Sequence, residues 1–130
     1  MHLIVEMRFG SHLYGTATEQ SDLDTKAVFI PSARDILLQR VRHTIVESAD
    51  KPAHRKNAPG AAESEAYSLQ RYLDLLAEGQ TVALDMLFAP DPAMLRQPDP
   101  LWREIQANAS RLVTRRASFF VRYCRQQANK

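Results

Sequence analysis

Apolar residues in the front half of the chain form short runs that end at turn-forming residues. Residues 3–9 mix β-branched and apolar side chains and stop at a glycine, and the apolar run over residues 23–30 stops at a proline. Runs closed in this way are typical of buried strands. A weak alternation over residues 43–47 and the stretch 63–67 predict two further short strands.

The rear half of the chain has the period of helices instead. Leu69, Tyr72, Leu73 and Leu76 follow the i, i+3, i+4, i+7 rule, and Gly79 can end that helix. The other predicted helices cover residues 34–38, 82–88, 101–109 and 112–128. The segments without a sustained period are residues 10–21, a loop or one short helix, and residues 48–62, a long loop.

Strands at the front and helices behind predict an α/β or α+β fold. With 130 residues, of which 45% are hydrophobic and 25% charged, the chain has the size and composition of one globular domain. We expect a core over residues 1–90 and a helical C-terminal segment over residues 91–130.

The sequence carries no sign of export or of a membrane anchor. Its apolar runs are too short to cross a bilayer, and its N-terminus lacks the basic start and cleavage site of a signal peptide. Cys124 is the single cysteine, which excludes an internal disulfide and a cysteine metal cluster. A cytoplasmic protein with no membrane partner is the simplest expectation.

The net charge of +2 is unevenly distributed along the chain. Residues 96–130 hold eight Lys or Arg against two Asp or Glu, and the rest of the chain holds nine against thirteen. A basic rear beside an acidic front suits a surface that meets phosphates next to a metal site. The alternative is a solvated basic helix face without a partner.

Asp22 and Asp24 carry the clearest chemistry. Side chains two positions apart in a strand point to the same face, so these two carboxylates would lie side by side. Like charges that close repel unless a cation neutralises them, and oxygen ligands suit Mg²⁺ or Mn²⁺. By itself the pair is weak evidence, because surface strands and turns contain Asp-x-Asp freely.

A glycine–serine turn precedes this carboxylate pair. Gly10 and Ser11 follow the first predicted strand, and Gly15 comes shortly after them. The exposed N–H groups of such a turn favour a phosphate, and Ser11 can add its hydroxyl. The alternative is that Gly10 only makes the turn and Ser11 only caps a helix. Together, the turn and the carboxylates predict a phosphate-binding loop opposite a metal site.

The block from Gly10 through Asp24 resembles the signature of nucleotidyltransferases in the DNA polymerase β superfamily, and it is most similar to the stand-alone bacterial and phage subgroup. The resemblance continues over residues 26–31, 67–76 and 79–88, with a fainter echo over residues 120–127. It implies a nucleotidyltransferase fold, in which helices flank a small mixed or antiparallel sheet with the metal-binding acids on one edge. It also implies a C-terminal segment shorter than that of many relatives.

The resemblance further implies a set of site residues. The nucleotide would be bound by Gly10, Ser11, Gly15 and Arg71, although Arg71 stands where the subgroup generally has lysine. Asp22 and Asp24 would hold metal, and the third acid would be Glu63 or Glu65, with a slight preference for Glu63 as a metal ligand. The alternative is that both glutamates are solvated loop acids.

The reaction implied by the family moves a nucleoside monophosphate from a nucleoside triphosphate to an acceptor hydroxyl and releases pyrophosphate. Two Mg²⁺ or Mn²⁺ ions would bridge the acids and the triphosphate. The acceptor would be an RNA end, a protein or a small molecule, and the basic C-terminal third leans slightly towards RNA. The alternative function is a catalytically weak nucleotide-binding regulator or toxin–antitoxin component that acts through a protein partner.

Overall fold

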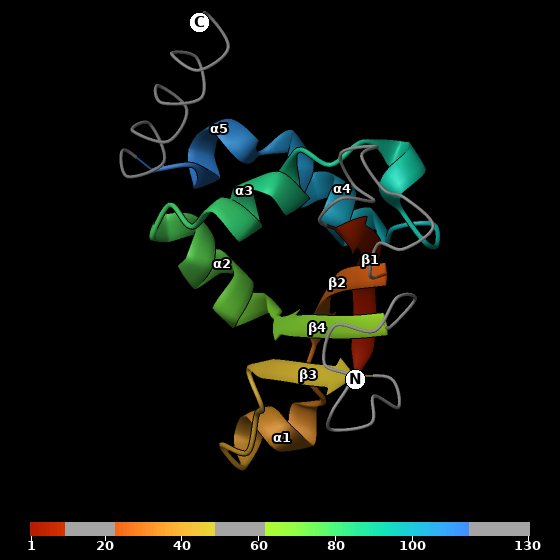
Figure 1. Cartoon of the computed structure of the whole chain (residues 1–130). Coiled ribbons are helices and arrows are strands. Elements are labelled where there is room, and N and C mark those ends of the chain that lie inside the picture. The colour runs from red at the N-terminus through yellow and green to blue at the C-terminus, as the bar shows by residue number, and fades with distance from the viewer. Residues whose placement is uncertain (10–22, 49–61, 115–130) are drawn as a thin grey trace, which may run out of the picture.

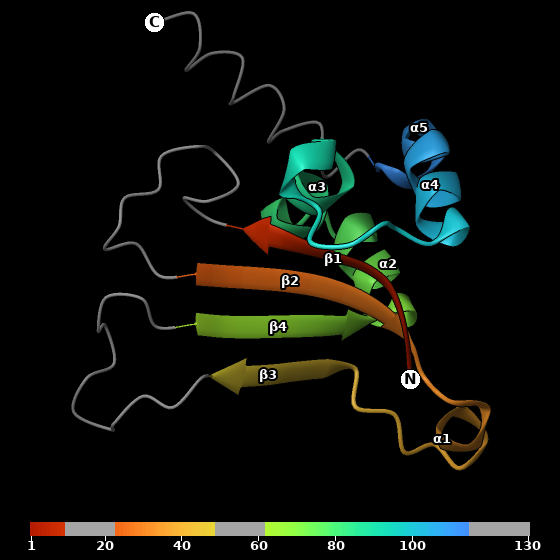
Figure 2. The same cartoon turned by 90° about the vertical axis from the view of Figure 1, so that its right-hand side faces the viewer.

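The computed structural model of the chain describes residues 1–9, 23–48 and 62–114. Within these residues, four strands form one sheet: β1 (His2–Phe9), β2 (Leu23–Ile30), β3 (Thr44–Ser48) and β4 (Ala62–Ser68). Their order is β1-β2-β4-β3 (Figure 2). The outer strands run antiparallel to their neighbours, whereas β2 and β4 pair in parallel. The two central strands therefore begin at the same end of a mixed sheet.

The helices lie mainly on one face of this sheet (Figures 1 and 2). Their bounds are α1 (Ala33–Leu37), α2 (Leu69–Ala77), α3 (Thr81–Leu87), η2 (Asp91–Ala93), α4 (Pro100–Ala107) and α5 (Ala109–Leu112). α2, α3 and α4 cover the sheet, while α1 lies away from them beyond the end of β2 (Figure 1). In the described part of the chain no helix has the length and apolar character needed to cross a membrane.

One hydrophobic core joins the covered face of the sheet to these helices. Val28 of β2 and Tyr67 of β4 belong to it, together with Tyr72 of α2 and Trp102 of α4. The Tyr72 and Trp102 rings lie 5.4 Å apart between centroids, and the Tyr72 hydroxyl donates to the carbonyl of Ala83 at 2.8 Å. Burial raises the pKa of Tyr72 well above its usual range, so that this hydroxyl stays a donor.

The described residues beyond position 90 pack onto the same core. The backbone N–H groups of Leu95 and Asp99 each donate, at 2.9 Å, to carbonyls of Glu6 and Ile4 in β1. These bonds hold the segment before α4 along β1, and Trp102 then enters the core. Residues 91–114 thus share their packing with the sheet.

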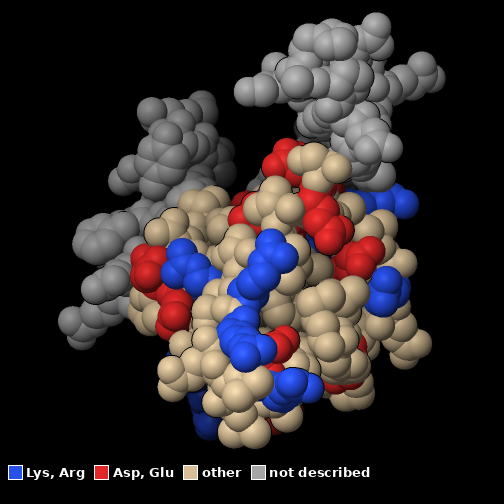
Figure 3. Space-filling model, turned by 90° about the horizontal axis from the view of Figure 1, so that it is seen from below, with Lys and Arg blue, Asp and Glu red and all other residues tan. Residues whose placement is uncertain are grey.

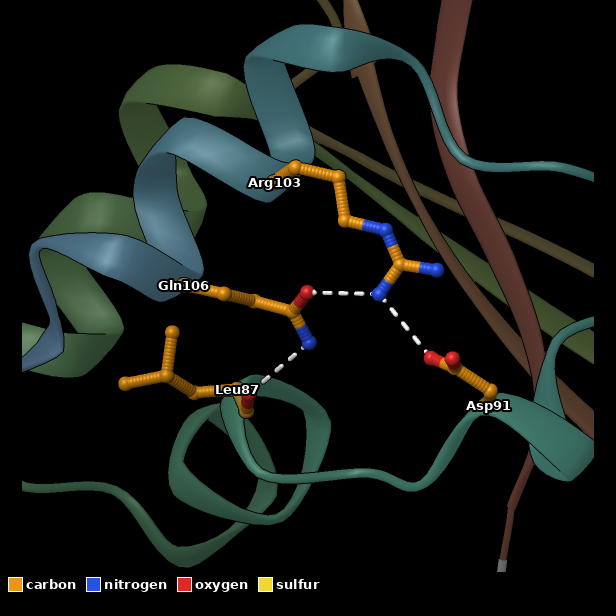
Figure 4. Close-up of polar contacts among 4 residues, drawn as sticks. All are labelled: Leu87, Asp91, Arg103 and Gln106. Atoms are coloured by element: carbon orange, nitrogen blue, oxygen red, sulfur yellow. Dashed lines mark hydrogen bonds and ion pairs between the residues drawn. The ribbon is translucent and has the colours of Figure 1, made fainter.

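A polar cluster on the surface ties α4 to the two preceding elements (Figure 4). Arg103 of α4 donates at 2.9 Å both to the carboxylate of Asp91 in η2 and to the side-chain oxygen of Gln106. Gln106 in turn donates to the carbonyl of Leu87, the last residue of α3, at 3.2 Å. Since the last carbonyls of a helix have no partner within it, this bond satisfies one of them.

Local signals in the sequence explain where the helices begin and end. The Ser32 and Ser68 side chains cap α1 and α2 by accepting from the backbone N–H groups three residues on. α2 ends in a Schellman motif, in which Gly79 has φ 73° and the Gln80 N–H donates to the carbonyl of Leu75 at 3.0 Å. The predicted ending of this helix at Gly79 is thereby confirmed.

The structure confirms the predicted α/β class and the four predicted strands, each within a residue or two. It also confirms the helices predicted within residues 34–38, 69–76, 82–88 and 101–109. The helix predicted over residues 112–128 is wrong at its start, because Leu112 ends α5 and Val113 has the extended values φ −80° and ψ 120°. The rest of that helix, with Cys124, lies outside the described residues, as do residues 10–21 and most of the loop predicted over residues 48–62.

Candidate active site

The predicted site residues fall partly within the described residues. Asp24 is the second residue of β2, and Glu63 and Glu65 lie in β4. Gly10, Ser11, Gly15 and Asp22 lie outside the described residues. The site can therefore be built from the two central strands.

Asp24 and Glu63 are aligned with each other across β2 and β4. Because aligned residues on neighbouring strands share a face, the two side chains project from the same face of the sheet, and the strands are only about 4.8 Å apart. Asp24 is half-buried and Glu63 is exposed, and neither forms an ion pair with a described residue. Two carboxylates thus lie side by side at the end of the sheet where the central strands begin.

The next aligned pair on this face is Lys26 and Glu65, and it is an ion pair. The Lys26 Nζ lies 2.7 Å from the Glu65 Oε2, with side chains 18% and 26% exposed. The same Nζ lies 5.5 Å from the centroid of the Phe9 ring, close enough for a cation–π interaction. Lys26 is therefore held by an acid on one side and an aromatic face on the other.

Glu65 is kept ionised by this environment. Partial burial raises the pKa of Glu65, but hydrogen bonds from Lys26 and Tyr67 outweigh it and leave the pKa below its ordinary value. Burial, followed by the bond to Glu65, raises the pKa of the Tyr67 hydroxyl above its usual range. The carboxylate of Glu65 consequently accepts hydrogen bonds from two side chains, whereas that of Glu63 forms no ion pair with a described residue.

This face of the sheet changes from apolar to charged along the central strands. The pair after Lys26 and Glu65 is Val28 and Tyr67, both of which belong to the core. The ion pair of Lys26 and Glu65 lies two residues nearer the start of the strands. The carboxylates of Asp24 and Glu63 lie two residues nearer still. The ion pair thus separates the apolar core from the carboxylate pair.

The acids lie on central strands, and this corrects one expectation from the resemblance. They were expected on one edge of the sheet, but β2 and β4 are flanked by β1 and β3. On the other side of Asp24, its aligned partner is Phe9, the last residue of β1. Gly10 follows Phe9 directly in the sequence.

Arg71 is not brought next to this carboxylate pair. It lies in the first turn of α2, after the end of β4, and its ion-pair partner is Glu78 at 3.9 Å. Glu63 is at the opposite end of β4, and five residues of strand span about 16 Å. The charge of Arg71 lowers the pKa of Tyr67, so Arg71 lies near Tyr67. The ion pair of Lys26 and Glu65 therefore lies between Arg71 and the carboxylate pair.

The carboxylates of Asp24 and Glu63 are suitable donors for Mg²⁺ or Mn²⁺. Hard divalent cations prefer carboxylate oxygens, and two acids that have no cationic partner among the described residues leave negative charge to be neutralised. Within the described residues, no group of three or more His, Cys, Asp or Glu could hold a metal ion. Asp24 and Glu63 could therefore act as two carboxylate ligands, and a complete metal site would need further donors.

Sequence reasoning did not place Lys26 beside the candidate acids. Lys26 follows Asp24 by two positions and Glu65 follows Glu63 by two, so both pairs share a face once the strands are aligned. The spacing was visible in the sequence, but the alignment of one strand with another was not. Without that register, Lys26 is only a charged residue in a strand.

The fold agrees with a family of nucleotidyltransferases. The chain belongs to the RNA repair pathway DNA polymerase beta family (RlaP), which it matches over residues 1–130. It is thus a DNA polymerase β-like nucleotidyltransferase by family, and its mixed sheet with helices is the corresponding nucleotidyltransferase fold.

A phage protein is also similar to this chain. It is an uncharacterised 38.9 kDa protein from the nrdC–mobD intergenic region of Enterobacteria phage T4, and the two are 40% identical over 131 residues. The alignment covers 100% of this chain but 39% of the phage protein, so the chain spans about two-fifths of the length of that relative.

Proposed function

We propose that the chain transfers a nucleoside monophosphate from a nucleoside triphosphate to an acceptor hydroxyl, with release of pyrophosphate. The observation that carries the proposal is the alignment of Asp24 with Glu63 at the start of two parallel central strands. The end of β1 at Phe9, opposite Asp24, supports it further, because the glycine–serine segment begins at the next residue.

Asp24 and Glu63, with Asp22, would hold divalent metal in this proposal. When bound, the metal supplies charge neutralisation for the triphosphate and lowers the pKa of the attacking hydroxyl. The acceptor oxygen forms a bond to the α-phosphorus as the bond to pyrophosphate breaks, and the hydroxyl proton passes to solvent. The protein contributes mainly by positioning and by fixed charge.

Glu63 is the better candidate for the third acid, because Glu65 already accepts from Lys26 and Tyr67. Lys26 then has a positioning role: it neutralises Glu65 and keeps that carboxylate away from the metal ligands. Gly10, Ser11 and Gly15 would contact the phosphates. Arg71 is a weaker candidate for binding the nucleotide, because its side chain is paired with Glu78.

The acceptor that we propose is an RNA end. The family is described by its place in RNA repair, and residues 96–130 carry eight Lys or Arg against two Asp or Glu. Basic side chains bind nucleic acid through its phosphates without reading its sequence. A protein or small-molecule acceptor is an outcome of the experiment below.

The test is transfer of labelled nucleotide by the purified chain. Each of the common nucleoside triphosphates is offered with an RNA oligonucleotide ending in a 3′-hydroxyl, in Mg²⁺, in Mn²⁺ and in EDTA. We expect labelled RNA and released pyrophosphate in the presence of metal. Asp22→Asn, Asp24→Asn and Glu63→Gln should each lower the rate by about 100-fold or more, which is typical for loss of a charge-stabilising group.

Two matched variants make this test specific. Glu65→Gln removes the alternative third acid and should cost much less than Glu63→Gln, while Glu47→Gln removes an exposed carboxylate from the neighbouring β3 and should have no effect. Transfer that is undiminished in Asp24→Asn would refute the metal site. Nucleotide binding without pyrophosphate release in the unaltered chain would instead support a nucleotide-binding regulator.

A further inference from the structure

A second concave site lies at the opposite end of the central strands from the carboxylates. It is a groove of about 680 Å³ between α1 and the first turns of α2. Its apolar lining consists of Ile30, Pro31, Ile36, Val41, Leu69 and Leu73. The polar residues around it include His43, which is hydrogen-bonded to the buried Ser68 at 2.6 Å. The groove therefore has a largely aliphatic floor on a rigid frame.

The apolar surface continues beyond the groove onto α1. Ile36 is 51% exposed, Leu37 81% and Leu38 47%, and α1 has no buried residue. Leu73, on the α2 side of the groove, is 36% exposed. A cluster of exposed aliphatic side chains around a concavity is the usual mark of an interaction site. A small ligand within the groove would leave Leu37 exposed to water, so a larger partner that also covers α1 fits better.

The rim of this surface carries more basic than acidic side chains. Arg34, Arg40 and Arg42 are exposed, and none of them forms an ion pair with another described residue. The acids here are Asp35 in the same segment and the exposed Asp74 in the lining of the groove, so the three arginines outnumber them. Figure 3, which views the molecule from the α1 end, shows Lys and Arg side chains beside uncharged surface. A partner with carboxylates next to its apolar side chains would complement this rim.

From these observations we propose that the groove binds an amphipathic helix of another protein, with a leucine-type face flanked by Asp or Glu. A helix lays such a face into a hydrophobic groove through side chains at i, i+3 or i+4, and i+7. This proposal does not depend on the proposed nucleotidyl transfer, because the groove and the carboxylates lie at opposite ends of the sheet.

Other occupants fit the groove less well. Among the described residues, its lining has no Phe, Tyr or Trp on which bases of RNA could stack. A concave surface suits an inserted helix better than the flat surface of a bilayer. In a two-fold dimer through this surface, the same net positive patch of both copies would be brought together, and like charge opposes that contact.

The experiment selects binders from a displayed library of helical peptides of about 16 residues. The apolar positions are fixed as leucine with helical spacing, and the flanking positions vary between Glu, Lys and Gln. The full chain is the target, and Leu73→Asp is used for counter-selection. Leu37→Ser is a second variant whose side chain is too exposed for its loss to unfold the protein.

We expect the enriched peptides to be acidic and to bind the unaltered chain at least about tenfold more tightly than Leu73→Asp, with a smaller loss for Leu37→Ser. Replacing Arg34, Arg40 and Arg42 with Glu should reverse the preference from acidic to basic peptides. The proposal is overturned by failure to enrich any peptide over the counter-selection, or by enrichment of basic ones. It is equally overturned if Leu37→Ser abolishes dimerisation, RNA binding or binding to anionic vesicles.

Discussion

The ammonium group of Lys26 lies 2.7 Å from the carboxylate of Glu65, across the boundary between the two central strands. This contact divides the acids of β4 into two kinds. Glu65 has its charge balanced within the protein, whereas Glu63 shares its end of the sheet with Asp24. The same strand therefore presents one acid suited to stability and one suited to binding a cation. The first two predictions test this division.

Removing one of the unbalanced carboxylates should stabilise the metal-free protein. Like charges directly opposite each other in a sheet are destabilising, by roughly 0.2–1 kcal/mol. We expect Asp24→Asn and Glu63→Gln to raise the free energy of unfolding by that amount in EDTA, as measured by urea denaturation. Glu47→Gln is the control for loss of an exposed glutamate in β3. A decrease in stability for both variants would show that the two carboxylates do not repel.

Removing the cation from the ion pair should have the opposite effect. Lys26→Met leaves the partly buried Glu65 without its charged partner, and loss of a hydrogen bond to a charged group costs about 1.5–3 kcal/mol. The double variant Lys26→Met/Glu65→Gln should cost less than the sum of the single variants, because residues in contact are coupled. Urea denaturation of all four proteins measures this coupling. Strict additivity would mean that the contact contributes nothing.

The ion pair also predicts a specific dependence of stability on pH. The pKa of Glu65 is lower in the folded chain than its ordinary value of 4.5. A depressed folded pKa gives a stabilisation that is fully present above the unfolded value and is lost as the pH falls through the folded value. The unaltered protein should therefore lose stability below about pH 4.5 more steeply than Glu65→Gln. Parallel curves from thermal unfolding across this range would contradict the prediction.

Two helix ends make a matched pair for a backbone test. In α1 and α2 the residue after the C-cap has a positive φ, 55° at Gln39 and 73° at Gly79, and both ends have the hydrogen bonds of a Schellman motif. Gly79→Ala should lower the free energy of unfolding by about 1 kcal/mol, because a Cβ disfavours this conformation. Gln39→Gly should raise it by up to about 1 kcal/mol for the same reason.

Chemical denaturation of both variants checks these values. Opposite signs at the two positions are the expected result. A gain in stability from Gly79→Ala, or a loss from Gln39→Gly, would mean that the positive φ is not what limits these two helix ends.

The sequence by itself determined the local elements of this protein. The strand runs ending at Gly10 and Pro31, the serine cap of α2 and its stop at Gly79 all act within a few residues, so their effect can be read along the chain. The block from Gly10 through Asp24 was sufficient to indicate the family for the same reason, because its residues are contiguous.

Only the tertiary structure decided which acids stand together. Whether Glu63 or Glu65 accompanies Asp24 depends on the register of β2 against β4, two parallel strands separated in sequence by α1 and β3. Parallel strands need a long crossover connection, and no local pattern fixes how they align. A shift of two residues would have exchanged the roles of the two glutamates, because side chains two apart share a face. The groove beside α1 was likewise not visible in the sequence, because its two walls come together only in the folded chain.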